Sequence, residues 1–231
     1  MSVAPAPITD RDPLVVLLTL LSLTTGIVDA TSVLGLGKVF TANMTGNVVF
    51  LGFAAGGAPG FHWELYVVAL ATFALGAIGS GRLGRHFIGR SRRRWLILSA
   101  AVEAALLWIA AAMTFAAPSQ TDPGLRLALI ALVAVAMGVR NATVRQLNVP
   151  DLTTTVVTRT ITGLAADSRL AGGPGKNLGR RLRAILSLFA GAALGAFMVL
   201  RWGVAPPLAL AGVTVLAFTW RLARDEAADN V

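Results

Sequence analysis

The chain has 231 residues and a net charge of +9; 55% of the residues are hydrophobic, 13% are charged, and the mean hydropathy is +0.72. Soluble domains carry about 25% charged residues, so this composition excludes disordered, collagen-like and ordinary soluble classes and indicates a chain that resides mostly in lipid. With no cysteine and only two histidines, disulfide frameworks, thiolate catalysis and Cys/His zinc sites are also excluded.

Six apolar stretches are long enough to cross a bilayer core, which needs about 20 helical residues. In chain order, the predicted transmembrane helices are 14–37, 63–81, 95–117, 125–149, 184–200 and 204–222. Tryptophan rings favour the membrane interface, and four of them lie at or near the ends of these stretches, namely Trp63, Trp95, Trp202 and Trp220. Residues 1–13 and 223–231 are predicted to be the terminal tails.

The basic residues are concentrated in two segments. Six arginines lie between Arg82 and Arg94, and five more basic residues lie between Arg169 and Arg183, with no acidic residue in either segment. These residues carry more positive charge than the whole chain has as net charge, so the remaining residues together carry a slight negative charge. Because basic loops between apolar spans stay in the cytoplasm, both segments are predicted to be cytoplasmic loops. This placement explains the positive charge without a nucleic-acid partner, and we expect none.

Two further stretches, 41–57 and 153–166, are too short or too polar to span the membrane. With both basic segments in the cytoplasm, the second stretch must enter and leave on that side. If the amino terminus is also cytoplasmic, the first stretch must be re-entrant from the outer side. The carboxyl terminus is then cytoplasmic as well. Such backbone is tolerated at membrane depth only where it is buried in protein or lines a wet cavity.

An internal repeat is indicated by residues 26–31 and 138–143, which share glycine, alanine and threonine at equivalent positions. The prediction is an all-α membrane protein with six transmembrane helices in two inverted three-helix repeats, each with a short re-entrant segment after its first helix. The repeats cover 14–117 and 125–222. Three helices per repeat is an odd number, so the second copy is inverted. Secondary transporters often use this plan, with the solute near the membrane midplane.

Polar side chains within the apolar stretches are the candidates for a substrate site. Asp29 lies inside the first span, where an ionisable group normally faces the protein interior and a partner, and the fourth span offers Arg140 and its neighbours. The run 41–47 is expected to open a short helix, 48–55, whose amino-terminal amides attract anions. The candidate substrate-binding residues are Asp29, Thr41, Asn43, Thr45, Gly46, Asn47, Arg140, Asn141, Arg145, Thr154 and Thr158.

These polar groups have two interpretations that the sequence leaves open. Asp29 and the arginines could form a buried ion pair that fixes helix packing, or they could form a substrate or proton site. Glu103, alone in the third span, is expected to be a paired or snorkelling structural charge. No catalytic group, metal or cofactor is expected.

The segments 26–30, 40–47 and 138–142 together resemble the YoaK-like family of bacterial six-helix membrane proteins, and the likeness covers nearly the whole chain. The resemblance implies an integral inner-membrane protein and assigns no biochemical role. Arg140 stands where family members usually carry glutamine, and Arg159 follows Thr158 where they usually carry glycine. An anion preference based on these arginines would therefore be particular to this chain.

The leading hypothesis is a small permease for a polar or anionic metabolite in the bacterial inner membrane, with a midplane site between two broken helices. The alternative is a non-transporting scaffold or partner-binding subunit whose polar seam is purely structural. An enzyme is not expected, because the carboxylates are scattered singly and no nucleophile, base and orienting group recur at a useful spacing. The expected partners are the lipid bilayer and an unidentified small solute, with a homo-oligomer left open.

Overall fold

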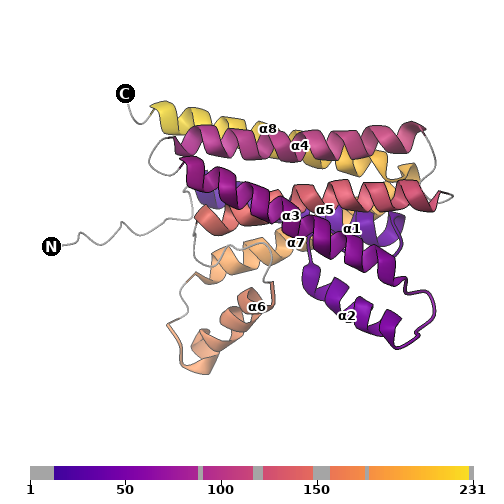
Figure 1. The fold of residues 1–231 in the computed structure, drawn as a ribbon. Helices are drawn as coiled ribbons and strands as arrows, with labels where there is room; N and C mark the ends of the chain where they lie inside the picture. The colour runs from indigo at the N-terminus through magenta and orange to yellow at the C-terminus, as the bar shows by residue number, and fades with distance from the viewer. Residues whose placement is uncertain (1–12, 88–90, 117–121, 148–156, 175–176, 229–231) are drawn as a thin grey trace.

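The computed structural model describes residues 13–87, 91–116, 122–147, 157–174 and 177–228, and these residues form helices and connections without strands (Figure 1). The elements in chain order are α1 (Pro13–Gly35), α2 (Met44–Ala55), α3 (Trp63–Phe87), α4 (Arg92–Ala116), α5 (Pro123–Leu147), α6 (Val157–Ala166), the 3₁₀ helix η1 (Arg169–Ala171), α7 (Leu178–Trp202) and α8 (Ala205–Ala228). The predicted all-helical class is confirmed.

Five helices in the described part of the chain are long and apolar enough to cross a membrane, namely α1, α3, α4, α5 and α7. Each of them coincides with one of the predicted spans. The sixth predicted span, 204–222, overlaps α8, which begins at Ala205 and has 24 residues but is not among these five. Its role as a membrane span therefore stays a prediction.

Parts of both basic segments are helical, so the prediction of loops is wrong there. Arg82 and Arg85 lie in the last two turns of α3, α4 begins at Arg92, and α7 begins at Leu178, before the last three arginines. The reason is that arginine is a good helix former. Hydropathy marks only the part of a helix that lies in an apolar environment, and the helix itself continues beyond it.

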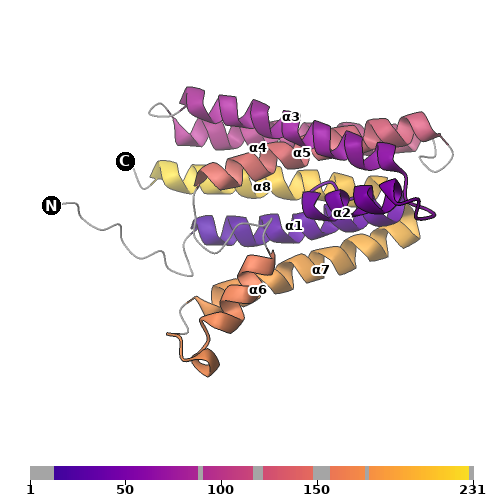
Figure 2. The ribbon, with the colours of Figure 1, turned by 60° about the horizontal axis from the view of Figure 1, so that its bottom comes forward.

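The long helices lie side by side as a bundle, with the two short helices at its flank (Figures 1 and 2). In this bundle α3 packs on α5, α1 on α7, and α4 on α8, while α4 also contacts α5 and α1 contacts α8. The short helices pack on their successors, α2 on α3 and α6 on α7. The start of α1 and the end of α8 lie at the same end of the bundle, as do the end of α3 and the start of α4 (Figure 2).

Two helix pairs make their closest approach at glycines. In both pairs a glycine on each helix faces main-chain atoms of the other helix, where an added Cβ would overlap them. Any side chain at these positions would push the helices apart. The glycines are Gly26 and Gly191 between α1 and α7, and Gly76 and Gly138 between α3 and α5.

Hydroxyl groups along α1 are satisfied within the helix itself. Thr19, Ser22, Thr25 and Thr31 each donate a hydrogen bond to the carbonyl oxygen four residues earlier, at 2.7 to 3.0 Å. Bonds of this kind let a polar residue lie in an apolar interior without a partner on another helix. They explain how α1 buries so many hydroxyls at the centre of the bundle.

Candidate functional site

The chain folds back along α1 directly after that helix ends at Gly35. The backbone N–H of Ala42 donates to Asp29 Oδ1 at 2.9 Å, and Thr41 Oγ1 donates to Ser32 Oγ at 3.3 Å. Asp29 lies six residues before the end of α1, which corresponds to about 9 Å along the helix axis. Residues 41–42 therefore lie beside the last two turns of α1.

The carboxylate of Asp29 lies at the amino-terminal end of α2. Besides Ala42, the backbone amides of Thr41 and Asn43 also stabilise its negative charge. Successive amides and the positive end of a helix dipole attract an anion. The anion bound at this position is the chain's own Asp29. The short helix begins at Met44, four residues before its predicted start, because the polar run contributes its first turn.

Asn47, in α2, also holds the segment that folds back along α1. Its side chain is fully buried; Oδ1 accepts from the Phe40 N–H at 2.9 Å, and Nδ2 donates to the Phe40 carbonyl at 2.6 Å. Gly46 leaves room for the Phe40 ring, which an added Cβ would meet at 2.6 Å. By contrast, Asn43 and Thr45 are exposed. We call the unit formed by Asp29 and residues 40–47 the α1–α2 reversal; in it, Asp29 and Asn47 bind backbone.

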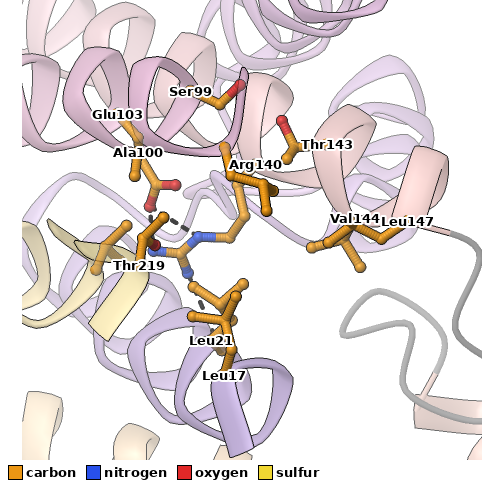
Figure 3. Close-up of a pocket in the computed structure, with 12 residues that line it drawn as sticks. Leu17, Leu21, Ser99, Ala100, Glu103, Arg140, Thr143, Val144, Leu147 and Thr219 are labelled. Carbon is orange, nitrogen blue, oxygen red and sulfur yellow. Dashed lines mark hydrogen bonds and ion pairs between the residues drawn. The ribbon is translucent and has the colours of Figure 1, made fainter. Parts of the chain in front are cut away.

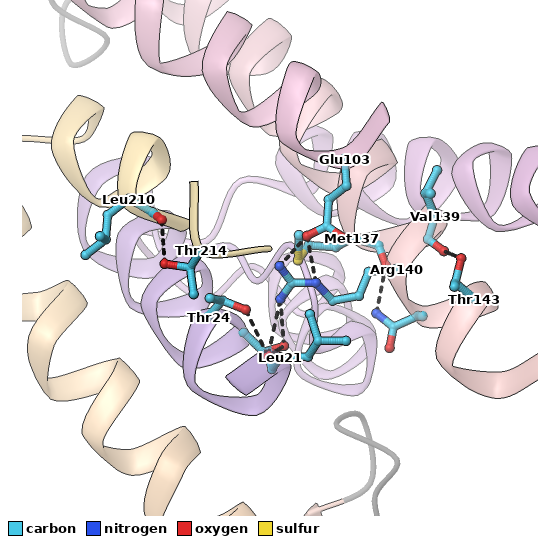
Figure 4. Close-up of polar contacts among 11 residues, drawn as sticks. Leu21, Thr24, Glu103, Met137, Val139, Arg140, Thr143, Leu210 and Thr214 are labelled. Atoms are coloured by element: carbon cyan, nitrogen blue, oxygen red, sulfur yellow. Dashed lines mark hydrogen bonds and ion pairs between the residues drawn. The ribbon is translucent and has the colours of Figure 1, made fainter. Parts of the chain in front are cut away.

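Arg140 forms a buried ion pair with Glu103 of α4 (Figure 4). Its Nε donates to Glu103 Oε1 at 2.8 Å, and Nη2 donates to the same oxygen. On the opposite side, Nη1 donates to Thr25 Oγ1 at 3.0 Å and to the Leu21 carbonyl at 3.4 Å. The guanidinium thus joins α1, α4 and α5, and only 2% of Arg140 and 3% of Glu103 are exposed.

Asp29 was expected to find its partner in the fourth predicted span, and the structure gives a different arrangement. Arg140 attracts Asp29 electrostatically, but the hydrogen bonds of the guanidinium go to Glu103, Thr25 and Leu21. The expectation that Glu103 is a paired structural charge agrees with its contact to Arg140. Because Glu103 balances the charge of Arg140, the arginine alone does not make this region attractive to anions.

A partly open cavity of about 30 Å³ borders the Arg140–Glu103 pair and is lined by α1, α4, α5 and α8 (Figure 3). Its walls are mostly apolar, and its polar lining residues are Ser99, Glu103, Arg140, Thr143 and Thr219. Ser99 is 3% exposed, and its Oγ has no hydrogen-bond partner among the described residues. Mostly apolar walls with a few convergent polar groups are typical of small-molecule sites. We call this feature the Arg140 cavity.

The other candidate residues lie elsewhere. Asn141 is half-buried on α5 and donates from Nδ2 to the Met137 carbonyl at 2.8 Å. Arg145, in the last turn of α5, and Thr158, in the first turn of α6, are exposed. Thr154 lies outside the described residues. The structure therefore brings Asp29, Thr41 and Asn47 together in the α1–α2 reversal and places Arg140 in a separate cavity.

Four polar lining residues of the cavity were absent from the candidates, namely Ser99, Glu103, Thr143 and Thr219. For Ser99 and Glu103 the signal in the sequence is their spacing with Trp95, which puts three polar atoms along one face of α4. Among the residues that the structure describes, no group of three histidine, cysteine, aspartate or glutamate side chains could hold a metal ion.

An all-helical fold with five apolar helices of membrane-spanning length and a charge pair buried in its interior defines a multi-pass membrane protein. Residues 17–220 match the family described as "Protein of unknown function (DUF1275)", and the chain belongs to this family. Over 155 residues it is 34% identical to the UPF0700 transmembrane protein YoaK of Bacillus subtilis (strain 168).

That alignment covers 65% of this chain and 65% of the relative's length. Together with the family match, it confirms the resemblance to the YoaK-like family. No solved structure matches the chain.

Proposed function

We propose that the protein is a small permease that moves polar or anionic solutes across the bacterial inner membrane. The observation that carries this proposal is the buried Arg140–Glu103 pair in the wall of a cavity between four long helices. Ionisable residues inside a membrane bundle are costly and commonly mark a solute or ion pathway. The solute would pass beside this pair.

The proposal includes two inverted repeats, 14–117 and 125–222. The repeats relate α1, α3 and α4 to α5, α7 and α8, respectively. Under this exchange the α1–α7 pair corresponds to the α5–α3 pair, and the α4–α5 contact corresponds to the α8–α1 contact. Each of these contacts is present. Gly26 and Gly138, at equivalent repeat positions, make matching close approaches. The Arg140 cavity lies between α1 and α4 of one repeat and α5 and α8 of the other. In transporters of this plan, one repeat rocks against the other around a site at their interface.

The proposed orientation puts the end of the bundle with the start of α1 and the end of α8 in the cytoplasm. The arginines at the end of α3 and the start of α4 lie at that same end (Figure 2). Clustered arginines beside membrane spans favour the cytoplasmic side. The cavity would then be lined on its cytoplasmic side by residues near helix ends, such as Leu17 and Leu147.

Flux in proteoliposomes tests this proposal. Purified protein would be reconstituted, and the uptake of a panel of small neutral and anionic solutes would be compared with that of protein-free vesicles. Val215, on α8, lines the cavity, so Val215→Phe should abolish uptake by filling it. Val213, on the same helix, is 54% exposed, so Val213→Phe is the matched control and should retain uptake. Equal uptake by the two variants, or none by the wild type, contradicts the proposal.

The alternative function is a membrane scaffold without transport. The α1–α2 reversal favours it, because Asp29 and Asn47 use their polar atoms to bind backbone rather than a solute. A scaffold would move no solute at any concentration in the flux assay, and Val215→Phe would alter stability alone.

A further inference from the structure

The turn between α6 and α7 presents a leucine to its surroundings. This turn contains the 3₁₀ helix η1, and Leu170 at the centre of η1 is fully exposed. It lies outside the apolar spans, in a segment that the sequence alone predicts to be a cytoplasmic loop. One exposed leucine on a water-facing surface is ordinary, so its meaning depends on how the turn is built and on what surrounds it.

Backbone hydrogen bonds give this turn a defined shape. The Ser168 carbonyl accepts from the N–H of Ala171 at 3.0 Å and from the N–H of Gly173 at 2.9 Å. The N–H of Gly172 donates to the Arg169 carbonyl at 3.1 Å. Gly172 has a φ of +78°, which glycine adopts without strain. The outward position of the leucine is therefore a feature of a well-formed turn.

An arginine joins the turn to both neighbouring helices. Arg181 of α7 donates from Nη1 to Asp167 Oδ2 at 2.7 Å and also to the Gly163 carbonyl of α6. Asp167 is the only acidic residue between 157 and 183, whereas six residues in this segment are basic. Because Arg181 already balances that carboxylate, the segment presents a positive charge, and Arg169 is exposed next to Leu170.

The apolar face of α7 continues to the level of this turn. Leu178, Leu182 and Leu186 are 44% to 54% exposed and recur every four residues, so they form a lipid-facing stripe from the first residue of the helix. Trp202 ends α7 on the other side, as expected at a membrane interface. A hydrocarbon core of about 30 Å takes about 20 helical residues, so it ends near Arg183. The start of α7 and the turn before it then lie at headgroup depth.

The position of the turn in the fold agrees with this depth. In both views of the bundle, α6 and the turn lie to one side of it, at the level where α1 starts and α8 ends (Figures 1 and 2). Among the described elements, α6 packs on α7 and η1. A segment beside a membrane bundle, at the level of its helix ends, borders lipid headgroups. This end also carries the arginines of α3 and α4.

We propose that α6 and η1 form a membrane-surface anchor that binds anionic phospholipids of the cytoplasmic leaflet, with Leu170 among the acyl chains and Arg169 at the headgroup phosphates. Apolar side chains next to basic ones are the combination that binds such lipids at an interface. The excess of basic residues favours anionic over zwitterionic headgroups. The anchor is independent of transport, although its leaflet follows from the orientation proposed above.

The absence of native cysteine allows a nitroxide label to be placed on the turn. Leu170→Cys would be labelled in the whole protein, in nanodiscs, and its depth measured by collision with oxygen, which concentrates in lipid, and with a nickel chelate, which stays in water. Leu186→Cys, on the lipid-facing stripe, is the reference inside the core. In phosphatidylglycerol the Leu170 label should be shielded from nickel almost as well as the reference. In phosphatidylcholine it should be more accessible to nickel.

A second variant tests the headgroup contact. The measured quantity is the fraction of phosphatidylglycerol in phosphatidylcholine that gives half of the shielding at the Leu170 label. Arg169→Gln should raise this fraction about fivefold, which is the effect of one basic residue near an anionic surface. Arg201→Gln is the matched control, because Arg201 is exposed in the last turn of the same helix, α7, at its opposite end. It should leave the fraction unchanged.

Three results would overturn the proposal. They are equal access of nickel to the Leu170 label in the two lipids, equal effects of Arg169→Gln and Arg201→Gln, and efficient disulfide-linked dimers of Leu170→Cys in liposomes. The last result would assign the turn to an interface between two copies of the chain. If Leu170→Cys does not fold, Ala171→Cys, exposed in the same turn, carries the label instead.

The anchor and the proposed function can fail separately. Shielding of the label without flux of any solute would reject the permease and leave the anchor standing. Flux without lipid-dependent shielding would reject the anchor and leave the permease standing.

Discussion

The α1–α2 reversal and the Arg140 cavity are both built from polar groups inside an apolar bundle, but they use these groups differently. In the reversal, Asp29 and Asn47 bind backbone atoms within 13 residues along the chain. In the cavity, Arg140 reaches partners 37 and 115 residues away, and Ser99 beside it has none in the described chain.

From this difference we infer that the two regions have separate roles, the reversal in folding and the cavity in function. Backbone groups freed by a chain reversal must be paired within lipid, and local side chains satisfy them at little entropic cost. The reversal is therefore expected to contribute stability. Partners on distant helices can only meet once the bundle has formed, and a hydroxyl left without a partner stabilises nothing. The cavity is therefore expected to contribute solute binding. Substitutions in the two regions test this division. Removing polar groups from the reversal should lower stability, whereas removing the Ser99 hydroxyl, or both charges of the Arg140–Glu103 pair together, should change it little; removing one charge alone is costly because its partner stays buried.

The largest effect is expected from Arg140→Met. This change leaves Glu103 buried without its partner, which should lower the free energy of unfolding by about 3–5 kcal/mol. The double variant Arg140→Met with Glu103→Leu removes both charges and should recover most of that loss. Denaturation in detergent micelles, followed by tryptophan fluorescence, measures both values. A double variant as unstable as the single one would show that the pair itself holds the helices together.

In the reversal, Asn47→Ala should come next. It leaves the N–H and carbonyl of Phe40 without their partner, and at about 1–3 kcal/mol for each group the loss should be at least about 2 kcal/mol. Asn43→Ala is the matched control, since Asn43 is exposed and its side chain makes no cap hydrogen bond. This control should stay within about 0.5 kcal/mol of the wild type. Similar losses in both variants would mean that the reversal is not held by Asn47.

The sequence predicts the reversal better than it predicts the cavity, and the reason is distance along the chain. The run 41–47 is polar in an apolar setting, so a break in the helix could be located to within a few residues. The length of the first apolar run likewise located α1 to within a few residues. Arg140 meets Glu103 because of how α4 and α5 are rotated about their axes relative to each other. Composition and hydropathy do not determine this rotation.

Asp29→Asn should have a smaller effect than Asn47→Ala. The amide keeps an oxygen for the Ala42 N–H but loses the charge, and hydrogen bonds to charged groups are roughly twice as strong as neutral ones. A loss of about 1–1.5 kcal/mol is expected from that difference. Solute uptake in proteoliposomes should be retained, because Asp29 does not line the cavity. Loss of uptake with unchanged stability would move the solute site to the reversal.

The smallest effect is expected from Ser99→Ala, and it separates the two regions most clearly. Removing a buried hydroxyl that has no partner should change stability by less than about 0.5 kcal/mol, or raise it slightly, because the cost of burying the group disappears. Ser22→Ala, at equal burial, removes a hydroxyl bonded to the Leu18 carbonyl and should cost about 0.5–1 kcal/mol. Parallel denaturation curves give both values. If Ser99→Ala costs as much as Ser22→Ala, the Ser99 hydroxyl is already paired in the unliganded protein, and the cavity belongs with the reversal as a structural element.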